Sequence, residues 1–158
     1  MNPVKLSEIA DGIESQNDEI SFYLNKKTGA VVMITEEDRS AANRIDEDGD
    51  SLEDFDDWQH EAIKAAIEIN DNSDDYLDLP SRYEVNEYKI MENFCDSIED
   101  ENLQEKFFIA INGKGAFRRF KDTAYRHDLL DNWYEFKMQA LKKKAIEWCE
   151  ENDINYTE

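Results

Sequence analysis

The sequence predicts an α+β fold: a mostly helical single domain with an N-terminal antiparallel β-hairpin packed on the helices. Two β-rich runs, residues 19–24 and 30–35, flank a five-residue turn that contains Asn and Gly, which is typical of a hairpin. Apolar side chains recur at helical spacing over much of the remaining chain. A length of 158 residues fits one domain, so we expect a single domain over residues 1–158.

The helical part is predicted as a series of amphipathic segments. In chain order we expect helices over residues 4–16, 57–70, 81–98, 101–112, 115–125 and 128–151. The third is expected to begin at Ser81, because Ser81 and Glu84 have the spacing of a capping box. Residues 76–79 are expected to be extended, because Pro80 disfavours a helical conformation in the residue before it.

Residues 36–57 are predicted to form an acidic, partly mobile loop within the domain. They contain many carboxylates and only Ile45, Leu52 and Phe55 as large apolar residues. The run from Asp46 to Ser51 resembles a calcium loop, but its glycine stands at position 4 instead of position 6. We therefore expect no metal site there, and no motif in the chain indicates a cofactor.

Charge is distributed unevenly along the chain, whose formal net charge is -21. Residues 36–101 hold 24 Asp/Glu against five Lys/Arg, whereas residues 102–158 hold ten of each. This acidity argues against a net attraction to nucleic acid or to an anionic membrane. A local cationic patch still acts at short range, because physiological salt screens charges beyond about 8–10 Å.

The chain is expected to be cytoplasmic and to have no membrane partner. Its first residues lack the apolar centre of a signal peptide, and no apolar run is long enough for a transmembrane helix. Cys95 and Cys149 lie far apart on predicted apolar helix faces, so we expect reduced core thiols.

The candidate ligand site is a glycine-led basic and aromatic block, residues 113–122. Backbone amides at a helix start favour an anion, and neighbouring cations would reinforce that preference. The candidate anion-binding residues are Gly113, Lys114, Gly115, Arg118, Arg119 and Lys121. In the alternative interpretation, Gly113 only ends the preceding helix and the cations pair with the acidic segment 36–101. A phosphate-binding loop of the nucleotide-hydrolase type is excluded, because its glycine and lysine spacing is absent.

Aromatic residues beside this block offer a candidate edge on which bases could stack: Tyr125, Trp133 and Tyr134. The same residues also fit an amphipathic helix that buries its aromatic side chains. Neither His60 nor His127 belongs to a metal-binding or catalytic motif, and no nucleophile can be assigned. We therefore expect a protein that is not an enzyme.

Several motifs together resemble a bacterial family known as uncharacterised protein family UPF0158. They are Leu79-Pro80-Ser81-Arg82-Tyr83, Glu87-Tyr88-x-Ile90-Met91-x-x-Phe94, the block Gly113–Asp122, Trp133-Tyr134-x-Phe136 and Ala145-Ile146-x-Trp148. The resemblance covers essentially the whole chain. It implies a small bacterial cytosolic protein, and it supplies no catalytic residues to carry over.

Two functions remain open at this level. The leading hypothesis is a non-enzymatic protein-binding or regulatory module that presents its acidic surface to a basic partner. The alternative is nucleic-acid or phosphoryl-ligand binding through residues 113–121. The two differ in whether the cationic residues are exposed and unpaired or are neutralised by the acidic segment. The partner's identity and the oligomeric state are open.

Overall fold

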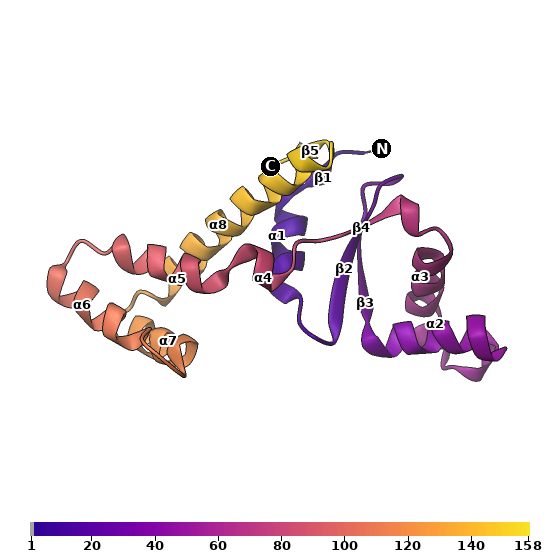
Figure 1. Cartoon of the computed structure of the whole chain (residues 1–158), viewed down its shortest axis with the longest axis horizontal. Coiled ribbons are helices and arrows are strands. Elements are labelled where there is room, and N and C mark those ends of the chain that lie inside the picture. Colours follow the sequence, from indigo (N-terminus) through magenta and orange to yellow (C-terminus); the bar gives the residue numbers. More distant parts are fainter. Residues whose placement is uncertain (1) are drawn as a thin grey trace. The chain divides into compact units, whose positions relative to one another are not determined.

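The computed structural model describes residues 2–158, which form the predicted mostly helical α+β fold (Figure 1). The elements are β1 (Val4–Lys5), α1 (Leu6–Ser15), β2 (Ile20–Asn25), β3 (Val31–Thr35), α2 (Glu36–Asp48), η1 (Leu52–Asp54), η2 (Asp57–Gln59), α3 (His60–Asp71), η3 (Ser73–Asp75), β4 (Tyr76–Asp78), α4 (Arg82–Val85), α5 (Glu87–Asp96), α6 (Glu101–Ala110), α7 (Ala116–Arg126), α8 (Leu130–Glu151) and β5 (Tyr156–Thr157).

The chain folds into two compact units. Unit 1 comprises the chain up to Arg82 together with Lys144–Glu158, and unit 2 comprises Tyr83–Lys143. Helix α8 begins in unit 2 and ends in unit 1. The single domain expected from the sequence stays a prediction, because it depends on whether the two units unfold cooperatively.

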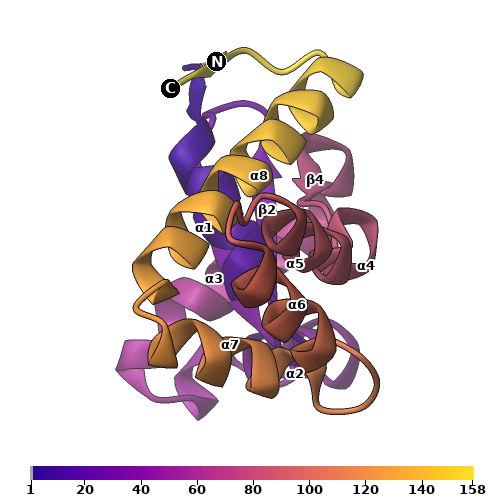
Figure 2. The same ribbon diagram turned by 90° about the vertical axis from the view of Figure 1, so that its left-hand side faces the viewer.

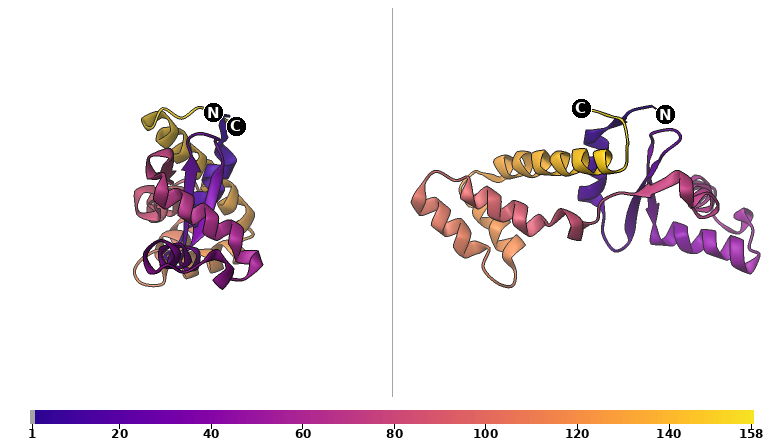
Figure 3. Two further views of the ribbon diagram at one scale, coloured as in Figure 1. Left: turned by 90° about the vertical axis from the view of Figure 1, so that its right-hand side faces the viewer. Right: turned by 45° about the horizontal axis from the view of Figure 1, so that its top comes forward.

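The sheet of unit 1 has the strand order β3-β2-β4 and is antiparallel throughout. The predicted hairpin is confirmed: Ile20 pairs with Thr35, and Leu24 pairs with Val31. On the other edge of β2, Leu24 pairs with Leu77, so the extended segment before Pro80 is a third strand. A separate parallel pair joins Val4 of β1 to Tyr156 of β5, so segments near the two ends of the chain lie side by side (Figure 3).

Unit 1 buries its apolar residues between this sheet and its helices. Helix α1 approaches the sheet closely at Gly12, where an added Cβ would lie 2.7 Å from Cδ2 of Leu79. Ile34 of β3, Ala42 of α2 and Ala66 of α3 form a buried cluster on the sheet. The hairpin is therefore packed on helices, as predicted.

The prediction of a loop over residues 36–57 is wrong for its first part, because Glu36–Asp48 is helix α2. The Thr35 hydroxyl accepts a hydrogen bond from the Asp38 amide, and the Asp38 carboxylate accepts one from the Thr35 amide, both at 3.1 Å. Acidic residues in the first turn also stabilise the helix through its macrodipole. Its buried residues, Ala41 and Ala42, are too small to produce a clear apolar stripe in the sequence.

The helix predicted to start at Ser81 is interrupted. Asn86 adopts a left-handed conformation with φ of 54°, which separates α4 from α5. Its side-chain oxygen accepts a hydrogen bond from the Lys89 amide at 3.2 Å, so Asn86 is the N-cap of α5. Asparagine tolerates this backbone region better than most residues, which explains why the break falls there.

An aromatic cluster forms the core of unit 2. Phe94 of α5 lies at its centre and makes edge-to-face contacts with rings from α6, α7 and α8. The ring-centroid distances from Phe94 are 6.1 Å to Phe107, 5.7 Å to Phe120, 5.6 Å to Trp133 and 5.3 Å to Phe136. Edge-to-face contacts of this kind stabilise the fold in addition to the hydrophobic free energy of the buried ring surface.

Candidate functional site

The predicted basic block lies on a helical hairpin formed by α6 and α7, which pack side by side in unit 2 (Figure 2). The Asp100 side chain caps α6 by accepting a hydrogen bond from the Leu103 amide at 3.0 Å. The turn between the helices contains Gly113 and Gly115, with φ values of 85° and 77°. Residues other than glycine rarely adopt a backbone conformation with positive φ. The two glycines therefore allow the chain to reverse within a few residues.

Arg119 fastens this turn to the end of α6. Its Nε donates to the Ala110 carbonyl at 2.9 Å, and its Nη2 donates to the Asn112 carbonyl at 2.7 Å. Its Nη1 donates to the Lys114 carbonyl. The last carbonyls of a helix have no hydrogen-bond donor within that helix. At the end of α6 the guanidinium of Arg119 is such a donor. Arg119 was predicted as an anion-binding residue, but these contacts make it a structural clasp of the turn.

The buried face of α7 consists of Ala116, Phe120 and Ala124. Phe120 is 1% exposed, as predicted, and its ring centroid lies 4.7 Å from that of Trp133. Phe117 was also expected to be buried, but it is 45% exposed, and its ring makes an edge contact with the ring of Tyr88 at a centroid distance of 6.4 Å. The face repeats every four residues instead of alternating between three and four, and this rotation brings Phe117 to the margin.

The proposed aromatic edge is present only in part. Tyr125 and Tyr134 are 76% and 44% exposed. Trp133 is 1% exposed and lies within the aromatic cluster, so its assignment to a stacking edge is wrong. Lys137 covers this ring, with Nζ 5.9 Å from the Trp133 centroid, and forms an ion pair of 3.1 Å with Glu87. Trp133 therefore contributes to stability and cannot offer a face to a ligand.

Lys114, Arg118 and Lys121 are exposed, as expected for residues that serve a ligand. Within residues 2–158, apart from the Arg82 side chain, no ion pair involves these three cations. In that part of the chain, the acidic segment 36–101 therefore does not neutralise them through ion pairs. The same alternative made Gly113 the end of the preceding helix, but α6 ends at Ala110 with Ile111 as its C-cap, so Gly113 lies in the turn.

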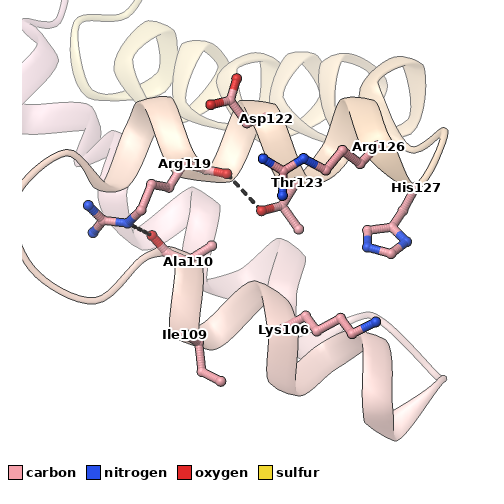
Figure 4. Close-up of a pocket in the computed structure, with 8 residues that line it drawn as sticks. All are labelled: Lys106, Ile109, Ala110, Arg119, Asp122, Thr123, Arg126 and His127. Carbon is pink, nitrogen blue, oxygen red and sulfur yellow. Dashed lines mark hydrogen bonds between the residues drawn. The ribbon is translucent and has the colours of Figure 1, made fainter.

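A groove lies between α6 and α7 and has a volume of about 340 Å³. It is lined by Lys106, Ile109, Ala110, Arg119, Asp122, Thr123, Arg126 and His127. Figure 4 shows the Lys106 side chain of α6 on the same side of the groove as His127, the Arg126 side chain lying back along α7 toward Thr123, and Asp122 extending away from α6. The groove is thus lined by cationic side chains from both helices and by the apolar residues Ile109 and Ala110.

Three residues that line the groove were not among the candidate site residues predicted from the sequence: Lys106, Arg126 and His127. Arg119, Thr123 and Arg126 follow one another at intervals of four and three residues, which places them on one side of α7. That periodicity is a usable signal. The contribution of Lys106 depends on how α6 packs against α7, which no local pattern reveals.

The sequence pattern that defines the Uncharacterised protein family (UPF0158) matches residues 1–158. The chain belongs to this family. The family resemblance seen in the motifs is thereby confirmed, and UPF0158 membership extends over both compact units.

Three bacterial relatives with the name UPF0158 protein match the chain. The protein of Chlamydia trachomatis serovar D is 27% identical over 161 residues, which cover 98% of this chain and 43% of that protein. The protein of Chlamydia muridarum is 26% identical over 161 residues, with 98% and 42% covered. The protein of Pseudomonas aeruginosa is 27% identical over 66 residues, with 41% and 43% covered. The chain spans less than half the length of the two chlamydial relatives, and no solved structure matches it.

Both cysteines are free and buried, which confirms the predicted core thiols. Burial raises the pKa of Cys95 from 9.0 to about 11, and the nearby negative charge of Asp96 adds to this effect. Burial likewise raises the pKa of Cys149 to about 11, with Glu150 as the second cause. Neither thiol has the depressed pKa that marks a nucleophile.

Within residues 2–158, no helix is both long and apolar enough to cross a membrane. The same range contains no group of three or more His, Cys, Asp or Glu side chains placed to hold a metal ion.

Proposed function

We propose that this UPF0158 chain is a non-enzymatic binding module that binds the phosphates of a nucleic acid through the exposed cations of α7 and of the turn before it. The observation that carries this proposal is the exposure of Lys114, Arg118 and Lys121 without ion pairs to the described carboxylates. Cations that served only to balance the protein's own acids would be expected to contact them. Phosphates bind lysine and arginine through charge-assisted hydrogen bonds.

The arrangement of these cations supports a linear anionic ligand. Arg118 and Lys121 are three residues apart on α7, and Tyr125 follows on the same side of the helix. Tyr125 is 76% exposed, so a base next to a bound phosphate has a ring on which to stack. From residue 106 to residue 127 the chain carries six Lys/Arg and a single carboxylate, Asp122.

The two units differ strongly in charge, and this sets the expected affinity. Unit 1 holds 27 Asp/Glu against eight Lys/Arg, whereas unit 2 holds twelve against ten. Repulsion from the acidic residues opposes the approach of nucleic acid at low salt and weakens as salt screens it. We therefore expect modest affinity and a shallow salt dependence, since each phosphate contact adds only roughly 0.7–0.9 to the log–log slope.

The test is the binding of a short single-stranded RNA and of the corresponding DNA across a salt series, measured by fluorescence anisotropy. The variant K114Q/R118Q/K121Q is expected to lose most of the affinity. A matched control, K89Q/K142Q/K143Q, removes the same charge from unit 2 at residues outside α7 and is expected to keep it. Equal loss in both variants would show a general charge effect and would contradict a specific site.

A basic protein partner is the second candidate function, and Trp58 is the observation that favours it. Trp58 of η2 is 76% exposed, and the exposed carboxylates of Asp56 and Asp57 directly precede it. Exposed tryptophans are frequent at the centres of protein interfaces, and acidic neighbours attract a basic surface. Pull-downs with and without nuclease separate the two candidates: a protein partner is retained after nuclease treatment, and its retention should depend on Trp58.

A further inference from the structure

We infer that the groove between α6 and α7 is a binding site for a phosphomonoester. This goes beyond the proposed contacts with backbone phosphates, which involve the outer side of α7. The groove also differs from that surface in its residues, since Lys106, Arg126 and His127 line it and Lys114, Arg118 and Lys121 do not.

The charges in the groove fit a dianion. Arg119 lines it, but the Arg119 guanidinium already donates to three carbonyls. In the described part of the chain, Lys106 and Arg126 have no ion pair or side-chain hydrogen bond, so both remain available to a ligand. A phosphomonoester carries nearly two negative charges at neutral pH, whereas a phosphodiester carries one. Two such cations from facing helices therefore match a monoester better than an internal phosphate of a nucleic acid.

The positions of His127 and Thr123 in the groove are fixed by the core of unit 2 and by hydrogen bonds within α7. The His127 ring lies 6.4 Å from the ring of Phe107, and the His127 amide donates to the Thr123 carbonyl at 3.2 Å. The Thr123 hydroxyl donates to the Arg119 carbonyl at 2.8 Å, which holds this side of α7 in place. Asp122, the single carboxylate of the lining, points away from α6 (Figure 4). An anion between Lys106 and Arg126 therefore avoids a facing negative charge from the lining residues.

The apolar part of the groove indicates an organic group attached to the phosphate. Ile109 is 66% exposed, and it lines the groove together with Ala110. A volume of about 340 Å³ falls within the range of small-molecule sites and is of the size of one nucleotide.

One chemistry can come from two sources, namely the 5′-phosphorylated end of a nucleic acid or a free nucleoside monophosphate. The experiment therefore uses both with the full chain. Anisotropy compares a single-stranded oligonucleotide bearing a 5′-phosphate with the same oligonucleotide bearing a 5′-hydroxyl. Calorimetry compares adenosine 5′-monophosphate with adenosine.

We expect at least one of these pairs to show a preference for the phosphomonoester of about tenfold or more, as two charge-assisted contacts imply. The variant K106Q/R126Q should abolish that preference and keep the binding of the 5′-hydroxyl oligonucleotide. The control K114Q/K121Q should weaken both oligonucleotides equally. A second variant, I109E, places a carboxylate in the groove at an exposed position and should abolish the preference independently.

The inference is overturned if neither pair shows a preference in the wild-type protein, or if the preference survives in K106Q/R126Q and I109E. A preference confined to the oligonucleotides identifies a nucleic-acid end as the ligand, and a preference confined to the monophosphate identifies a free nucleotide. Failure of the proposed nucleic-acid function is a different result, because it appears as no binding of either oligonucleotide.

Discussion

The Arg119 guanidinium donates through Nε to the carbonyl of Ala110 at 2.9 Å, so a side chain of α7 completes the last turn of α6. The same guanidinium satisfies the Asn112 and Lys114 carbonyls in the turn. One residue thereby holds the two helices of the candidate site in register. Within the part of the chain that the structure describes, the neighbouring Arg118 and Lys121 make no such contacts, so the charge of Arg119 is structural and the charges of Arg118 and Lys121 are available to a ligand.

Replacing Arg119 with alanine is expected to lower the free energy of unfolding by about 2 kcal/mol, because it leaves carbonyls at the end of α6 without their charged donor. Replacing the adjacent Arg118 with alanine should change it by less than about 0.5 kcal/mol. Urea denaturation followed by circular dichroism measures both values. Equal effects at the two positions would contradict the clasp.

Phe120 and Phe117 are expected to differ in their contributions to stability. Phe120→Ala should cost about 3–5 kcal/mol, because it opens a cavity in the aromatic cluster of unit 2. Phe117→Ala should cost about 1–2 kcal/mol, because roughly half of that side chain is already in water. Thermal and urea denaturation measure the stability lost in each variant. A larger loss in Phe117→Ala than in Phe120→Ala would contradict this expectation and would place Phe117 on the buried face of α7.

The two buried thiols are expected to make stability depend on alkaline pH. Each has a folded-state pKa of about 11, above its ordinary value of 9.0, so the unfolded chain loses these protons first. Their contribution is complete below about pH 9 and is lost as the pH rises toward 11. Urea denaturation at pH 7.5, 9 and 10.5 measures the decline, which should be smaller in C95A/C149A. An equal decline in that variant would assign the effect to other groups.

The capping box of α2 is expected to contribute measurably although the helix is acidic and largely exposed. Thr35→Ala should cost about 1 kcal/mol, and Asp38→Ala a similar amount. The two changes should not be additive, since each removes part of one reciprocal pair. Hydrogen exchange of the amides in residues 36–48 provides the local measurement. Fast exchange of these amides in the wild-type protein would indicate the loop that the sequence analysis predicted.

Local patterns predicted the hairpin, α6, α7 and α8 because their signals lie within a few neighbouring residues. They missed α2, whose buried contact consists of Ala41 and Ala42, which carry little hydrophobic signal. They also missed the break at Asn86, because Ser81 and Glu84 offered a capping pattern that extended the helix through it. Both features depend on single polar residues, the Thr35 and Asp38 pair that caps α2 and the left-handed Asn86 that caps α5, and the apolar periodicity does not register such residues.

For the candidate site, the sequence located the basic block but not the roles within it. Residues three and four apart both fall near one helix face, so Phe117 and Ala116 were equally able to precede Phe120 on the buried side. The clasp formed by Arg119 was beyond prediction, because its acceptors are backbone carbonyls, which every residue has. The groove is lined by Lys106 of α6 and Arg126 of α7. These residues come to line one groove through the packing of α6 on α7, which local sequence patterns do not reveal.

The parallel pairing of Val4 with Tyr156 has a consequence for biosynthesis. Unit 2 is one uninterrupted stretch, Tyr83–Lys143. All residues that pack together in this unit have therefore left the ribosome before Lys144 emerges. Unit 1 stays incomplete, with β1 unpaired, until residues 144–158 have been synthesised, because they form β5 and the end of α8. The middle of the chain can therefore mature before its beginning, the reverse of the usual N-terminal-first order. During that interval the edge of β1 and the acidic surface of unit 1 are exposed to other components of the cell before unit 1 is complete.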